Sequence, residues 1–81
     1  MSYFVYILKC NDNSFYTGIA IDVDKRVNEH NNSSKGAKYT KARRPVKLLY
    51  KEKYKDRSSA CKREYAIKQL TRDEKKVLIN A

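Results

Sequence analysis

Five side chains in this 81-residue sequence are of types that transfer protons or bind anions: Tyr6, Tyr16, Arg26, His30 and Glu64. Phenols and imidazoles exchange protons, a guanidinium binds phosphate or carboxylate, and a carboxylate binds cations. Gly18 follows the second tyrosine by two positions, within a segment that otherwise favours a β-strand. Because a glycine inside a strand usually marks a bulge or a close approach, we expect another group to approach the chain at Gly18.

The two tyrosines can meet only if their strands pair in one particular register. Residues 3–10 and 14–20 are rich in strand-forming residues, and the Asn-Asp-Asn segment between them is typical of a turn. If those three residues form the loop, Tyr6 lies opposite Gly18, and Tyr6 and Tyr16 are diagonal neighbours on one face. A loop of two or four residues would instead place the tyrosines on opposite faces of the sheet.

A helix that follows the second strand positions Arg26 and His30. Asp22 is a suitable N-cap for residues 23–31, and the asparagines and serines after them favour the end of the helix. At about 100° per residue, Arg26 and His30 fall within the same arc as the two valines of this segment. The valines therefore predict the buried side of the helix, and Arg26 and His30 line its flank.

Glu64 is a carboxylate on the predicted inward face of a later helix. It lies four residues after Ala60 and three before Ile67, which belong to the apolar stripe of that helix. An inward carboxylate is costly unless it is paired, hydrogen-bonded or bound to a metal. One interpretation is an ion pair with a nearby Lys or Arg, or a helix rotated toward solvent. The other is that Glu64, Arg26, His30 and the two tyrosines converge on one pocket.

The remaining segments complete an α+β fold. Residues 46–54 alternate enough for a third strand, Asp56 or Ser58 can cap the second helix, and residues 71–80 form a short basic amphipathic segment. Residues 33–45 form a basic loop that contains a glycine and a proline. The order ββαβαα predicts a small three-stranded antiparallel sheet flanked by helices.

The charge of the chain points to a polyanionic partner. Nineteen Lys and Arg residues against nine Asp and Glu give a net charge of +10 and a pI near 9.8. We expect nucleic acid first and an anionic membrane surface second. Tyr39 either stacks on a base or packs within the protein. The candidate nucleic-acid contacts, all in the basic loop, are Lys35, Lys38, Tyr39, Lys41, Arg43 and Arg44.

Length and composition set the remaining limits. Residues 1–81 predict a single domain with one modest core. No apolar run is long enough to span a membrane, and the N-terminus lacks the pattern of a secretion signal, so we expect a cytoplasmic protein. Cys10 and Cys61 are then expected to be reduced, and with one histidine besides they do not predict a structural zinc site.

The order of these features resembles the GIY-YIG nuclease domain, particularly its short stand-alone bacterial members. Val5-Tyr6-Ile7 stands where the first family triplet does, and Tyr16-Thr17-Gly18 where the second does. Arg26 and His30 match the catalytic helix, and Glu64 matches the single metal-binding glutamate. The resemblance covers about residues 3–79; Val5 and Thr17 depart from the family's Gly and Ile, and neither departure changes a reacting group.

The resemblance implies hydrolysis of DNA phosphodiester bonds with one divalent ion, Mg²⁺ or Mn²⁺, held by Glu64. It implies that Arg26 holds the phosphate and that Tyr6 orients or deprotonates the attacking water. His30 is the alternative proton acceptor, and Tyr16 would hydrogen-bond a metal-bound water or the phosphate. Asn80 is the one candidate for the asparagine that often completes the family's site.

Three functions remain open from the sequence. The first is a metal-dependent DNA endonuclease, structure-selective and related to repair. The second is a non-catalytic, sequence-independent nucleic-acid-binding module, motivated by the charge. The third is an adaptor whose basic surface meets an acidic protein. DNA is the expected partner, with RNA as the alternative.

Overall fold

The N-terminal β-hairpin has the register that the sequence predicted. In the computed structural model, which describes residues 1–81, β1 pairs antiparallel with β2 and Tyr6 lies opposite Gly18. The backbone N–H of Cys10 donates to the carbonyl of Ser14 (2.8 Å), and Asn13 adopts a left-handed conformation with φ of 68°. Asparagine tolerates that conformation, so the three-residue loop forms and both tyrosines face the same side.

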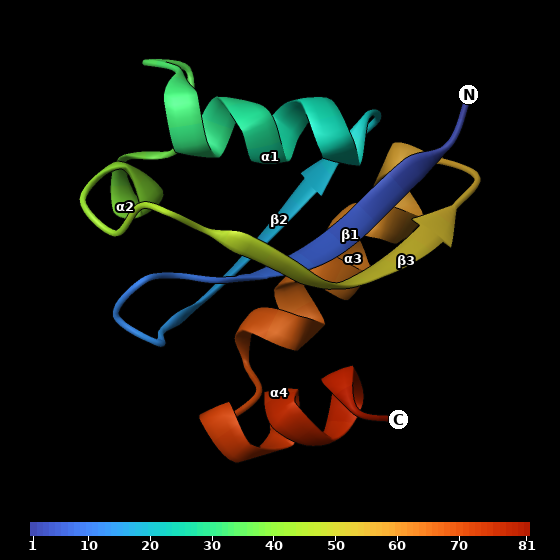
Figure 1. Ribbon diagram of the computed structural model, residues 1–81. Helices are drawn as coiled ribbons and strands as arrows, with labels where there is room; N and C mark the ends of the chain where they lie inside the picture. The colour runs from blue at the N-terminus through green and yellow to red at the C-terminus, as the bar shows by residue number, and fades with distance from the viewer.

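The protein is an α+β fold with one three-stranded antiparallel sheet in the order β2-β1-β3 (Figure 1). The elements are β1 (Tyr3–Lys9), β2 (Phe15–Ala20), α1 (Val23–Asn32), α2 (Lys38–Lys41), β3 (Lys47–Tyr54), α3 (Arg57–Lys68) and α4 (Arg72–Ile79). The predicted fold class is therefore confirmed. β2 and β3 are the edge strands, and this places the second tyrosine-bearing strand at one margin of the sheet.

The helices begin where suitable caps occur. The side chain of Asp22 accepts from the backbone N–H of Lys25 at the start of α1, and Asp56, one of the two expected caps, does the same for Ser59 in α3. Thr71 opens α4 with a reciprocal capping box. The sequence did not predict α2, a single turn within the basic loop, because four residues carry no helical periodicity.

The two faces of the sheet carry different helices and different parts of the core. Tyr6, Leu8 and Val23 belong to the cluster beneath α1, whereas Val5, Ile7, Ala60 and Ile67 form the cluster beneath α3. In Figure 1, α1 crosses one face, and α3 and α4 lie on the other. Residues of α1 and α3 can therefore approach each other only around an edge of the sheet.

Candidate active site

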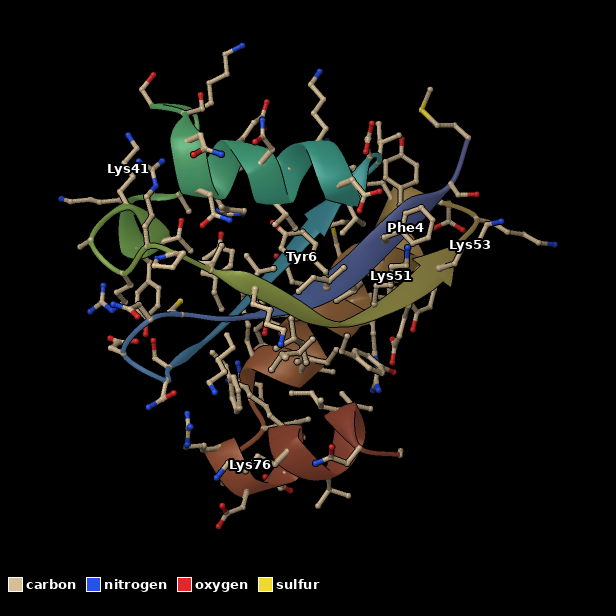
Figure 2. All side chains as sticks on the ribbon, viewed as in Figure 1. Phe4, Tyr6, Lys41, Lys51, Lys53 and Lys76 are labelled. Atoms are coloured by element: carbon tan, nitrogen blue, oxygen red, sulfur yellow. The ribbon has the colours of Figure 1, made fainter.

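Tyr6 and His30 are in direct contact in the interior of the protein. The Oη of Tyr6, on β1, lies 2.8 Å from Nε2 of His30, on α1. The exposed fraction of Tyr6 is 1% and that of His30 is 0%. Figure 2 shows Tyr6 between α1 and the sheet. His30 is thus a buried partner of the phenol and not a surface residue.

The second ring nitrogen of His30 contacts Thr40, a residue that the sequence analysis did not single out. Its Nδ1 lies 2.8 Å from Oγ1 of Thr40, and the Thr40 hydroxyl donates to the carbonyl of Ala37 at 2.9 Å. Thr40 is fully buried because α2 turns it toward α1. The sequence signal that could have indicated its role is an uncharged hydroxyl residue within a run of basic residues.

Gly18 provides the space in which the Tyr6 phenol lies. A Cβ at this position would lie 2.5 Å from the Tyr6 Oη and 3.1 Å from Cε2 of Tyr16. Real Cβ atoms essentially never come that close to another heavy atom, so any side chain here would displace the phenol. The group that approaches the chain at Gly18 is therefore the side chain of Tyr6.

Tyr16 packs against both His30 and Tyr39. Its ring centroid is 5.1 Å from that of His30, edge to face, and 6.0 Å from that of Tyr39, with the rings at 26°. The guanidinium of Arg43 lies 3.9 Å from the Tyr39 ring centroid. Tyr39 thus contacts Tyr16 and Arg43 but is 39% exposed, so stacking on a base stays a prediction.

Arg26 lies at the rim of this cluster and is half-buried. Its Nη1 donates to Oε1 of Glu29 at 3.1 Å and to the carbonyl of Lys35 at 2.8 Å. The pKa of Tyr6 is raised to about 12, chiefly by burial and also by the charge of Tyr16, while the Arg26 guanidinium acts in the opposite direction. Arg26 is therefore close enough to act on the phenol and leaves other guanidinium donors free.

Glu64 comes to the same region from the other face of the sheet. Its side chain is 21% exposed, and its Oε2 lies 3.4 Å from Nζ of Lys68, one helical turn away. The Glu64 charge also contributes to the raised pKa of Tyr6. Both interpretations of Glu64 thus hold in part: it is ion-paired, and it lies near the phenol of Tyr6.

Burial keeps the Tyr6–His30 pair neutral. The pKa of His30 is lowered to about 4, chiefly by desolvation and also by the nearby positive charge of Arg26. With the pKa of Tyr6 raised to about 12, transfer of the phenolic proton to the imidazole in the resting protein is strongly disfavoured. Any ionisation of Tyr6 therefore needs a further positive charge.

Two clefts lie beside these residues, and neither is lined by all five of them. Tyr16 lines a cleft of about 240 Å³ along β2 together with Tyr39, Lys68 and Lys75. Arg26 lines a second cleft, of about 360 Å³, at the start of α1. The physical reason is that α1 and α3 lie on opposite faces, so their side chains meet only around the edge of β2.

The basic loop divides into exposed and engaged residues. Lys35, Lys38 and Lys41 are exposed, and Lys41 extends from the α2 end of the molecule in Figure 2. Arg43 is half-buried and donates from Nε to Asp12 at 3.0 Å and from Nη1 to the carbonyl of Tyr39 at 2.9 Å.

Arg44 is tied to the C-terminal end of α1, contrary to its expected place among the free phosphate contacts. It donates to the carbonyls of His30, Ser33 and Glu29. These carbonyls lie at the C-terminal end of α1, which attracts a cation, and those of Glu29 and Ser33 also accept from backbone N–H groups. Arg44 therefore holds the loop onto α1, and a phosphate would have to compete with these bonds.

Asn80 lies apart from the cluster. Its Nδ2 donates to the carbonyl of Lys76 at 2.8 Å, and it lines another cleft with Phe15 and Arg72. Nothing in this arrangement brings Asn80 to Glu64.

The donor set suits a hydrated divalent ion and no other metal centre. There is no group of three or more His, Cys, Asp or Glu side chains that could hold a metal. Mg²⁺ keeps several waters and is commonly bound through one or two carboxylates plus substrate phosphate. The ion pair of Glu64 with Lys68 engages Oε2, so Oε1 fits the role of a single carboxylate ligand. Both cysteines are free thiols, and no helix is long and apolar enough to cross a membrane.

A comparison with protein families identifies the class as a nuclease catalytic domain: residues 2–77 match the GIY-YIG catalytic domain. The chain therefore belongs to the GIY-YIG family, as its sequence suggested.

Relatives and solved structures agree with this assignment. The UPF0213 protein SERP0126 of Staphylococcus epidermidis is 61% identical over 77 residues, which cover 95% of this chain and 93% of the relative. The UPF0213 protein DP2720 of Desulfotalea psychrophila is 54% identical over 80 residues, which cover 99% of this chain and 73% of the relative. The protein EF2693 from E. faecalis, solved by solution NMR, is 44% identical in sequence and superposes with a TM-score of 0.67. The match covers 99% of this chain and 84% of that chain.

Proposed function

We propose that this protein is a divalent-metal-dependent endonuclease that hydrolyses phosphodiester bonds in DNA. The observation that carries the proposal is the contact between Tyr6 and His30 beside Gly18, with Arg26 on one side of the β2 edge and Glu64 on the other. Membership of a nuclease family supports the same reaction class. We further propose that branched DNA of the kind formed during repair is the preferred substrate.

The residues have separate roles in this mechanism. Arg26 would bind the scissile phosphate, because a guanidinium stays charged and stabilises the negative charge that develops on the phosphate oxygens. Tyr6 would orient the attacking water and accept its proton. Tyr16, which packs on His30, would hydrogen-bond the phosphate or a water of the site.

Glu64 would hold the ion, Mg²⁺ or Mn²⁺. When bound, such an ion polarises the phosphate and stabilises the leaving oxygen. Its ligation by Glu64 competes with Lys68, whose exposed ion pair is worth only about 0.2–1 kcal/mol. Lys35, Lys38, Lys41 and Arg43 would bind flanking phosphates without reading sequence.

The test is metal-dependent nicking of plasmid and of branched and linear oligonucleotide duplexes. The wild type is compared with Glu64→Gln, Arg26→Ala and the control Asp73→Asn, which makes the same charge change on exposed α4. We expect both site variants to lose about 100-fold or more of the rate, and the control and wild type to be equal. Equal nicking by all four proteins would identify a contaminating nuclease and remove the proposal.

A second candidate, a binding module without turnover, is favoured by one observation. The Glu64–Lys68 ion pair satisfies the carboxylate without a metal, and a charge of +10 suffices for sequence-independent binding. This function predicts binding that weakens steeply with salt and is unchanged by EDTA or by Glu64→Gln. Manganese-dependent binding that requires Glu64 would contradict it.

A further inference from the structure

A continuous chain of polar contacts runs from Tyr6 into the protein and ends at a backbone carbonyl. Three contacts form it: Tyr6 Oη to His30 Nε2 (2.8 Å), His30 Nδ1 to Thr40 Oγ1 (2.8 Å), and Thr40 Oγ1 to the Ala37 carbonyl (2.9 Å). The three side chains are buried. Every hydrogen in the chain must therefore be placed by the protein and not by solvent.

The carbonyl end decides where each hydrogen lies. A carbonyl oxygen can only accept, so the contact to Ala37 holds the hydroxyl hydrogen of Thr40. Thr40 Oγ1 then accepts from the other side, and Nδ1 of His30 carries the ring hydrogen. Neutral imidazole has one N–H, so Nε2 is a bare acceptor and the Tyr6 hydroxyl donates to it.

The reverse arrangement satisfies fewer groups. If Nε2 carried the hydrogen, the Thr40 hydroxyl would have to donate to Nδ1, and two oxygens would face each other at 2.9 Å without a hydrogen between them. Tyr6 would accept from His30, and its own hydroxyl hydrogen would have lost its acceptor there. A buried donor without a partner is costly.

We propose that Thr40 is a positioning residue that fixes His30 in its Nδ1–H tautomer and thereby directs the Tyr6 hydroxyl hydrogen inward, toward α1. The lone pairs of the Tyr6 oxygen then face away from His30, toward the β2 edge, where the attacking water would be held. The catalytic consequence rests on the proposed nuclease function; the tautomer itself does not.

The proton balance follows from this orientation. As the water oxygen bonds to phosphorus, the water O–H bond breaks and its proton passes to the Tyr6 oxygen, whose own proton passes to Nε2 of His30. The phosphorus–oxygen bond to the leaving group breaks, and solvent protonates that oxygen. The resulting imidazolium is buried, and the proton returns through Tyr6 to solvent before the next turnover. With the other tautomer, Nε2 could not accept a proton.

The experiment is a long-range ¹H–¹⁵N NMR correlation on uniformly labelled protein, which is simple because His30 is the only histidine. The shifts of the two ring nitrogens distinguish N–H from a bare nitrogen. We expect Nδ1–H in the wild type and in Thr40→Ser, which keeps the hydroxyl. Thr40→Val removes the acceptor and should shift His30 toward Nε2–H. Tyr6→Phe should keep Nδ1–H, because Thr40 and not Tyr6 sets the tautomer.

Nicking rates are measured on the same proteins. We expect Thr40→Val to lose about 10–100-fold, as orienting partners of a reacting group typically do, and Thr40→Ser to recover most of the rate. An Nε2–H wild type, or a Tyr6→Phe variant that changes tautomer, would overturn the assignment even if Thr40→Val did not fold. A tautomer change in Thr40→Val with an unchanged nicking rate would overturn the catalytic consequence. Absence of nicking in the wild type would instead remove the proposed function and leave the tautomer result standing.

Discussion

Acidification should destabilise this protein well before its carboxylates titrate, and His30 should be the cause. Burial lowers the pKa of the folded-state imidazole to about 4, from an ordinary value of 6.5. As pH falls, the unfolded chain therefore binds a proton first, so the free energy of unfolding decreases. The contribution is fully present above pH 6.5 and is lost progressively as pH falls to about 4.

The magnitude follows from the two pKa values. Between pH 7 and pH 5 the free energy of unfolding should fall by about 2 kcal/mol, and over the whole window by about 3 kcal/mol. The pKa values of Asp12, Glu52 and Glu74 are lowered from 3.8 or 4.5 by hydrogen bonds and charge, so these groups act at lower pH. His30 is the only histidine, so the interval from pH 5 to 6.5 belongs to it.

The assay is urea unfolding followed by circular dichroism at pH 7, 6 and 5. With an m-value of about 1–2 kcal/mol/M, the midpoint should move down by about 1–2 M urea. His30→Gln, which has no titratable ring, should show a midpoint that is nearly constant over the same interval. A wild-type midpoint that does not change from pH 7 to pH 5 would refute the reasoning. Should the variant fail to fold, an NMR titration of folded wild-type His30 near pH 6.5 would have the same consequence.

Two further predictions concern residues that the structure places in supporting roles. Gly18→Ala should displace the buried Tyr6 phenol and cost about 1–3 kcal/mol of stability, measured by urea unfolding; unchanged stability would contradict the crowding. Arg44→Ala should cost about 1–3 kcal/mol because the His30 carbonyl loses its donor and two other carbonyls lose one of theirs, and should leave the salt dependence of DNA binding nearly unchanged. Its control, Lys41→Ala, should change stability by no more than about 0.5 kcal/mol and reduce the slope of DNA affinity against salt by about one. A stability loss in Lys41→Ala with a reduced slope in Arg44→Ala would mean that Lys41 is the structural residue and Arg44 the phosphate contact.

The fold was predictable because its signals are local. Alternating strand residues, an Asn-rich turn and the caps at Asp22 and Asp56 each specify an element without reference to distant parts of the chain. The register followed from the loop length alone. The short helix α2 was missed because its single turn is formed by tertiary contacts, with Thr40 turned inward against His30.

The site was predictable in its members but not in its arrangement. Helical spacing placed His30 beside Arg26, and the glycine at position 18 indicated a close approach. Spacing could not indicate that His30 has a second partner, because Thr40 lies ten residues away across an irregular loop. It also could not show that Arg44 is bound to carbonyls, since charge by itself does not distinguish a free guanidinium from an engaged one.

In the proposed nuclease, the position of the candidate residues around an edge strand would determine how DNA approaches. Tyr6 and Arg26 would act from the α1 face and Glu64 from the α3 face, so a phosphate that contacts both would lie along β2. Lys75 lines the cleft on that edge. Lys53 pairs with β1 on the far side, in β3, roughly 10 Å from β2 at two strand spacings.

Matched charge reversals test this approach, because both lysines change by the same amount. Lys75→Glu should weaken DNA binding by about tenfold, through a lost phosphate contact, whereas Lys53→Glu should change it by less than about twofold, since screening removes most of its effect. Fluorescence anisotropy with a labelled duplex at 0.15 M salt measures both. Equal losses of affinity would mean that the whole +10 surface attracts DNA without a preferred edge. A larger loss for Lys53→Glu would place the DNA over β3, where Glu64 and Tyr6 could not both reach one phosphate.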